Sequence, residues 1–278
     1  MKKQIVLFYL AIASLLFGVG LYMVETSSFF SEHLLVIVLI GIVSSFIGTL
    51  AGGGGLITLP AMMLTGIPIQ TSIATNKFSS GIAAFSSVFY FINRKQLKAK
   101  AILKNLFVAL AGGIGGALLT AHFSEQAMNM LALILLVIVF VITMMNKEWS
   151  ESGQEAEDVV VMTKWKALLP FFIAVYDGGF GPGSSTFGIL YYLKNHQNYI
   201  QAVQLTRVLI LGSCTGGFIV FYQTGFFHWS YAIAMALGSV IGSQIGLLVL
   251  PRVSIKIAKV LLVTIICLLI TQMFFRII

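Results

Sequence analysis

Two basic residues stand alone in apolar sequence: Lys77 in TSIATNKFSSG and Arg207 in QAVQLTRVLI. An offset of 130 residues places one on the other. On insertion scales, each costs about 2.5–3.5 kcal/mol at the centre of a bilayer, so both positions need a reason. Arginine can hold an oxyanion through two parallel hydrogen bonds, and lysine supplies a compact charge. We expect both cations to line one anion-binding cavity; the competing interpretation is that each side chain snorkels to the membrane surface.

Glycine-rich segments precede both cations. The first, GTLAGGGGLITLP, covers Gly48 to Pro60, and the second, YDGGFGPGSSTF, covers Tyr176 to Phe187. Consecutive glycines are unfavourable in a helix, and Pro182 lacks a backbone donor, so we expect a break in each segment. The helix that follows a break presents free N–H groups that favour an anion. Close helix packing through glycine is the competing interpretation.

The predicted binding residues are the two cations, their polar helix neighbours and the residues that follow each break. They are Lys77, Arg207, Asn76, Thr75, Thr206, Gln204, Gly53, Gly54, Gly55, Gly183, Ser184 and Ser185.

Asp177, next to Tyr176, is the only one of nine acidic residues inside an expected membrane segment. The same offset pairs Asp177 with Ile47, so this charge breaks the similarity between the halves. It could carry a proton during transport, or it could be static, as a counter-ion for Arg207 or a cap on the half-helix. We place both Asp177 and Tyr176 at the candidate site and leave these roles open.

The elements that position these residues are membrane helices. The 278 residues are 58% hydrophobic and 9% charged, whereas soluble domains are roughly 25% charged. Apolar stretches near the roughly 20 residues that span a bilayer predict helices at about 5–24, 73–92, 101–120, 127–146, 201–222, 229–249 and 255–275. Two further apolar regions, about 34–68 and 167–193, contain the breaks, and we expect each to be a re-entrant hairpin.

Basic residues collect in cytoplasmic loops, which sets the orientation. The cluster from Arg94 to Lys104 therefore lies inside, which puts the N-terminus in the cytoplasm and the C-terminus outside. The predicted segments are an N-terminal transmembrane helix (1–30), a first repeat (31–146), an acidic cytoplasmic linker (147–164) and a second repeat (165–278). Because the basic residues lie in membrane loops rather than on a soluble patch, nucleic acid is not an expected partner.

The two repeats are predicted to run in opposite directions. Sliding the later helices by 126 residues sets Gly112 and Gly116 against Gly238 and Gly242, small-residue pairs that let helices pack closely. The expected fold is an all-α polytopic membrane protein of two inverted repeats. Each repeat has a broken re-entrant helical hairpin plus three transmembrane helices, and one extra helix precedes them, as in many secondary transporters.

These motifs resemble the sulfite exporter TauE/SafE family, also called the toluene sulfonate uptake permease family. The resemblance covers the chain from about residue 34. It rests on the glycine run with Pro60, on GIP at Gly66 to Pro68 followed by ATNK at Ala74 to Lys77, and on YDGGFGPG at Tyr176 to Gly183. It implies a carrier for sulfur-containing anions in the bacterial inner membrane. Ser184 and Ser185 depart from the usual glycine after GPG.

The expected function is a secondary transporter that moves sulfite, thiosulfate, a sulfonate or sulfoacetate by alternating access with proton coupling. A passive anion channel and a carrier for a non-sulfur organic anion are the alternatives. A lipid-modifying enzyme is disfavoured because no catalytic triad or metal cluster is evident, and His33, His122, His196 and His228 fall in loops or at span ends. We expect no catalytic residue, metal or cofactor; the partners are a small anion, membrane lipid and protons, with oligomer formation left open.

Overall fold

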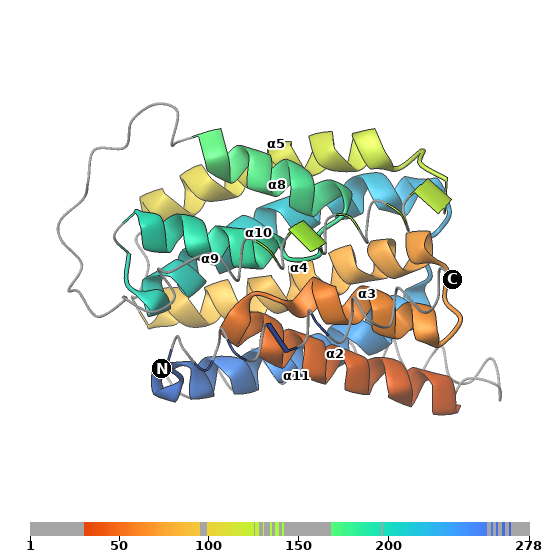
Figure 1. Cartoon of the computed structure of the whole chain (residues 1–278), viewed down its shortest axis with the longest axis horizontal. Helices are drawn as coiled ribbons and strands as arrows, with labels where there is room; N and C mark the ends of the chain where they lie inside the picture. The colour runs from red at the N-terminus through yellow and green to blue at the C-terminus, as the bar shows by residue number, and fades with distance from the viewer. Residues whose placement is uncertain are drawn as a thin grey trace.

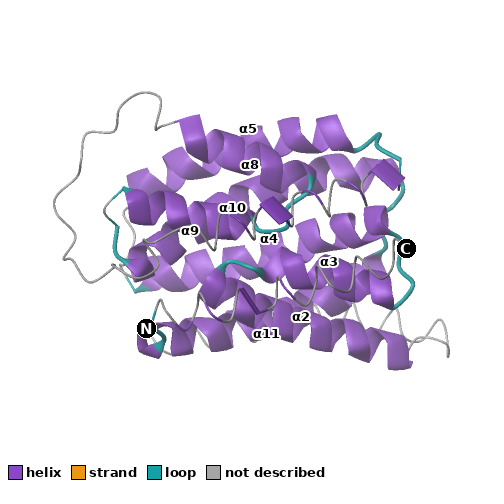
Figure 2. Cartoon of the chain, viewed as in Figure 1, coloured by secondary structure: helices purple, strands orange, loops and turns teal. Residues whose placement is uncertain are grey.

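The computed structural model describes residues 31–94, 99–124, 168–195 and 197–254, with scattered positions between 126 and 141 and between 257 and 267. These residues form helices joined by short loops, and no strand occurs among them (Figure 2). The predicted N-terminal helix and the 147–164 linker lie outside the described residues. The predicted spans at 127–146 and 255–275 are described only in part.

The helices of the first half are α2 (Ser31–Ala51), α3 (Gly54–Leu64), α4 (Ile69–Asn93) and α5 (Ala99–Thr120). Those of the second half are α8 (Leu169–Gly179), α9 (Ser184–Lys194), α10 (Tyr199–Phe221) and α11 (Trp229–Val249). Short 3₁₀ turns, η2 (Tyr222–Thr224) and η3 (Leu250–Arg252), follow α10 and α11. Four helical segments are long and apolar enough to cross a membrane: Leu34–Ala51, Ile102–Thr120, Tyr199–Thr224 and Trp229–Arg252.

Both predicted breaks are present. The first separates α2 from α3 at Gly52 and Gly53, where Gly52 has a φ of +83° that favours glycine. The second separates α8 from α9, and positive-φ glycines flank Pro182 there. Figure 2 shows both breaks as loops inside the bundle, whereas the other loops lie at its ends.

Each break folds the chain into a hairpin. In the first, Ile37 near the start of α2 clusters with Met62 near the end of α3. In the second, Tyr176 of α8 contacts Phe187 of α9, with ring centroids 5.7 Å apart. In Figure 1 the hairpins open toward opposite ends of the bundle. One detail differs from the expectation of a purely re-entrant segment: α2 has 21 residues and is itself long enough to cross a bilayer.

Two antiparallel helices, α4 and α10, form the centre of the bundle. Gly81 of α4 faces Cys214 of α10, and Val88 clusters with Val208. Helix α4 carries polar residues along its length, and most of its side chains are buried against protein. This burial explains how a helix with low hydropathy sits among the apolar ones.

Candidate functional site

The two breaks meet in the interior. A Cβ on Gly52 would lie 2.6 Å from the backbone nitrogen of Thr186, and one on Gly55 would lie 3.5 Å from Cα of Pro182 and 3.6 Å from Nδ2 of Asn76. Glycine is therefore needed at Gly52 both for its φ and for this close approach. The two breaks and the start of α9 therefore converge beside α4.

Lys77 points into this region and does not snorkel. Its side chain is fully buried, and its ammonium donates a hydrogen bond to the backbone carbonyl of Asp177. Nζ also lies 3.8 Å from Oδ1 of Asp177. Gly181 and Gly217 leave room for the lysine, because a Cβ on Gly181 would lie 2.6 Å from Nζ and one on Gly217 would lie 3.2 Å from Cδ.

Three further groups surround the Asp177 carboxylate. The Ser184 hydroxyl donates to Oδ1 at 2.5 Å, the Ser213 hydroxyl donates to Oδ2, and the Cys214 thiol lies 3.4 Å from Oδ2. Asp177 therefore links α8 to α4, α9 and α10. Of the static roles considered from the sequence, a counter-ion for Arg207 is wrong: the basic partner of Asp177 is Lys77, and the contact with α9 runs through the Ser184 side chain.

Arg207 has a different environment. Arg207 is 8% exposed, and its guanidinium donates to the hydroxyl of Thr49 in the last turn of α2. Thr49 Oγ1 lies 3.3 Å from Oγ of Ser243, which is 2.8 Å from Oγ of Ser87. Among the described residues no carboxylate pairs with Arg207. The charge is thus buried against neutral hydroxyls, an arrangement that leaves it available to an anion.

Several buried hydroxyls near these elements have no hydrogen-bond partner in the described structure. They belong to Thr75, Thr186, Tyr192 and Thr206. Thr206 precedes Arg207 and packs against Gly188, where a Cβ would lie 3.0 Å from its Oγ1. Thr186 lies in the first turn of α9, against Gly52. An unpaired buried hydroxyl is costly, so a polar ligand or water is the natural partner.

Two tyrosine hydroxyls donate hydrogen bonds to backbone carbonyls at the breaks. The Tyr176 hydroxyl donates to the carbonyl of Pro182, and the Tyr199 hydroxyl donates to the carbonyl of Leu50 at the end of α2. Carbonyls at helix ends lack intrahelical partners, so these bonds stabilise the interrupted backbone. Tyr176, predicted as part of the site, thus has a structural contact there.

The remaining predicted residues lie around the breaks. Gly53 precedes the first residue of α3, Gly54, and Gly183 precedes the first residues of α9, Ser184 and Ser185. Gln204 is buried on α10. Sequence reasoning missed Thr49, Ser87, Ser213 and Ser243, which supply the hydroxyls around the charges.

The described side chains include no group of three or more metal-ligating residues. Lys77 and Arg207 have separate partners, so the expectation that they share one pocket remains a prediction.

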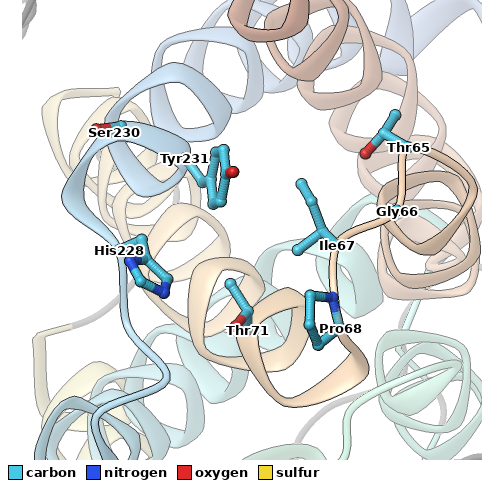
Figure 3. A pocket seen from close by; sticks show the side chains of 8 residues that line it. All are labelled: Thr65, Gly66, Ile67, Pro68, Thr71, His228, Ser230 and Tyr231. Carbon is cyan, nitrogen blue, oxygen red and sulfur yellow. The ribbon is translucent and has the colours of Figure 1, made fainter. Parts of the chain in front are cut away.

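A pocket of about 310 Å³ lies at one end of the bundle, between the α3–α4 loop and the start of α11. Figure 3 shows its polar lining, which includes the side chains of Thr65, Thr71, His228 and Tyr231. Thr71 lies six residues before Lys77 on α4, about 9 Å along the helix axis at 1.5 Å per residue. The pocket therefore lies at the end of the bundle from which α4 runs toward Lys77.

Comparisons with known proteins agree with the fold and the motifs. The chain is similar to "Probable membrane transporter protein ORF9" of Sinorhizobium sp, with 30% identity over 83% of this chain and 88% of the relative. It is also similar to "Probable membrane transporter protein YfcA" of Escherichia coli K12, with 26% identity over 76% of this chain and 78% of the relative. A "Probable membrane transporter protein" of Haemophilus influenzae is 28% identical over 77% of this chain and 84% of its own length.

No solved structure matches the chain. The family description "Sulfite exporter TauE/SafE" matches residues 37–273, which include both breaks, both buried cations and Asp177. The chain is therefore a multi-pass membrane protein that belongs to the sulfite exporter TauE/SafE family of membrane transporters.

Proposed function

We propose that the protein is a secondary transporter that moves a small sulfur-containing oxyanion across the bacterial plasma membrane by alternating access, coupled to protons. The candidate substrates are sulfite, thiosulfate, sulfonates and sulfoacetate. The single observation that carries the proposal is Arg207: a buried guanidinium beside neutral hydroxyls, with no carboxylate partner among the described residues. Such a charge needs a compensating anion, and guanidinium binds oxyanions through paired hydrogen bonds.

The start of α9 supports an anion at this position. The helix begins after Gly183, and the Ser184 N–H donates to the carbonyl of Gly181. The helix dipole favours a negative charge at this end. Thr186 in this turn has a buried, unpartnered hydroxyl. It packs against Gly52, one turn from Thr49, and Thr49 in turn binds Arg207. We therefore place one small anion at the end of α2, among these three groups.

Helix packing supports the inverted repeat. The offset of 130 that relates Lys77 to Arg207 also relates Gly112 and Gly116 of α5 to Gly242 and Gly246 of α11. The first pair packs on α8, and the second pair packs on α2. Gly238, which the 126-residue shift matches to Gly112, also packs on α2, so both offsets pair glycines at helix contacts. Equivalent halves of opposite direction are the usual basis of alternating access.

In the proposed orientation the N-terminus is cytoplasmic, and α4 begins at the outer surface. The Thr71–His228 pocket then opens outward, and we assign it as the outer approach to the site. Lys77 lies further along α4 and pairs there with Asp177 of α8. Helix α4 reaches the level of Arg207 beyond Lys77, where Val88 clusters with Val208.

A direct test is the thermal stability of the purified protein with sulfite, thiosulfate, sulfate, sulfoacetate and taurine. A ligand that binds only the folded state raises the unfolding temperature, and the shift grows with the logarithm of its concentration above the dissociation constant. We expect at least one sulfur oxyanion to stabilise the wild type and to leave Arg207→Ala unchanged. If none of the panel stabilises the wild type, the oxyanion assignment is wrong.

A further inference from the structure

We propose that Asp177 is the proton-binding site of the transporter and that its protonation releases Lys77 to bind the substrate. One proton and one divalent oxyanion then move together. The inference rests on the proposed transport function and adds a coupling residue, a coupling ion and the charge of the substrate.

The first step is that Lys77 is bound to Asp177 in this structure. Its ammonium is fully buried, donates to the Asp177 carbonyl and lies 3.8 Å from the carboxylate. An anion placed on Lys77 would lie beside that carboxylate. Two negative charges this close repel strongly where protein rather than water surrounds them. The charged form of Asp177 therefore competes with the substrate for Lys77.

The second step is that the surroundings of Asp177 accept either protonation state. The hydroxyls of Ser184 and Ser213 donate to the carboxylate, and a hydroxyl can instead accept from a carboxylic acid by rotating. A proton on Asp177 can therefore be placed without leaving a buried polar atom unpaired.

The titratable neighbours of Asp177 come from a few helices. Lys77 faces it from α4, Cys214 faces it from α10, and Tyr176 precedes it on α8. From α9 the facing group is the Ser184 hydroxyl. Helix α5 packs on the same turn of α8 through glycine, where Gly113 meets Gly178. Among the described residues, Lys77 is thus the charged group whose partner changes when Asp177 takes up a proton.

The third step is a count of charges. Among the buried residues that the structure describes, Lys77 and Arg207 leave one net positive charge when Asp177 is charged. With Asp177 protonated, the two cations match the two negative charges that thiosulfate or sulfoacetate carries near neutral pH. The O–H bond on Asp177 forms as the Lys77 ion pair breaks, and the ammonium keeps its own proton. The charge count therefore favours a divalent oxyanion accompanied by one proton.

The experiment measures protons directly. Thiosulfate or sulfoacetate is added to purified protein in weak buffer with a pH indicator, because neither anion takes up a proton itself near neutral pH. We expect the wild type to take up about one proton per bound anion, and its affinity to fall about tenfold per pH unit where Asp177 is charged. Asp177→Asn should bind the anion with no proton uptake and with an affinity independent of pH. Glu32→Gln, the same acid-to-amide change in the first turn of α2, should match the wild type.

The outcomes separate the two proposals. Anion binding by the wild type without proton uptake overturns the coupling inference and leaves the transport function standing, as does unchanged proton uptake by Asp177→Asn. If the wild type binds none of the sulfur oxyanions, the proposed function itself fails. The wild-type proton count needs no variant, so it decides the question even if Asp177→Asn does not fold.

Discussion

Lys77 and Asp177 form a buried ion pair between the two halves of the chain, with Nζ 3.8 Å from Oδ1. The residues are 100 positions apart, and the carbonyl of Asp177 accepts a second bond from the same ammonium. Removing one partner of a buried pair typically costs about 3–5 kcal/mol because it strands the other charge, whereas replacing both can be neutral.

We therefore expect Lys77→Met and Asp177→Asn each to destabilise the protein by about 3–5 kcal/mol and the double variant to lose less than either single variant. Unfolding midpoints of the wild type, both single variants and the double variant in the same detergent give the coupling energy. Additive losses in the double variant would show that the two side chains do not interact.

Replacing Arg207 should affect anion binding rather than stability, because the hydrogen bond described for its side chain is with a neutral hydroxyl. Arg207→Ala should reduce anion affinity by the roughly 2–5 kcal/mol of a buried charged contact, which is about 30-fold or more. The stability of the anion-free protein should change little. Transport into proteoliposomes and binding to purified protein measure the loss.

Thr49→Val is the matched control for Arg207, because it removes the hydroxyl partner and keeps the guanidinium. We expect it to weaken binding by less than Arg207→Ala. Equal losses in the two variants would mean that Arg207 acts through Thr49 rather than on the substrate.

The sequence was sufficient to predict the two helix breaks but not the side chains that contact the buried charges. Consecutive glycines and Pro182 disrupt helices through local backbone effects, so both interruptions could be predicted. The burial of Lys77 and Arg207 could be predicted because a charge exposed to the bilayer is costly. The offset that pairs the cations matches Asp177 with Ile47, and this symmetry suggested no link from Asp177 to Lys77. Thr49 and Ser213 are ordinary polar residues of apolar helices, and only their neighbours in space, 158 and 36 residues away, reveal their role.

The length of α2 could not be predicted from the sequence either. An apolar run gives the same signal whether its helix crosses the membrane or turns back within it, and the glycines mark only where the helix stops.

Gly52 should be the more sensitive of two glycines with similar backbones. Gly52 has a φ of +83° and Gly66 a φ of +87°, but a Cβ on Gly52 would meet Thr186 at 2.6 Å, whereas nothing lies within 4 Å of one on Gly66. Gly66→Ala should lower the free energy of unfolding by only the roughly 1–2 kcal/mol that alanine costs in a left-handed backbone conformation. Gly52→Ala should lose more and should also lower anion affinity, because it separates the breaks. Similar unfolding midpoints and anion affinities for both variants would argue against the close contact between Gly52 and Thr186.

The α5–α8 contact offers a second matched pair within one helix. A Cβ on Gly116 would lie 1.8 Å from the carbonyl oxygen of Val175, whereas nothing lies within 4 Å of one on Gly115. Since alanine favours a helix over glycine by about 1 kcal/mol, Gly115→Ala should be neutral or stabilising. Gly116→Ala must move α5 away from α8, which carries Asp177, so we expect a lower unfolding temperature and weaker proton-linked anion binding. Thermal unfolding in detergent, with and without thiosulfate, separates these effects; a Gly116→Ala protein as stable as Gly115→Ala would contradict the close packing that holds Asp177 against Lys77.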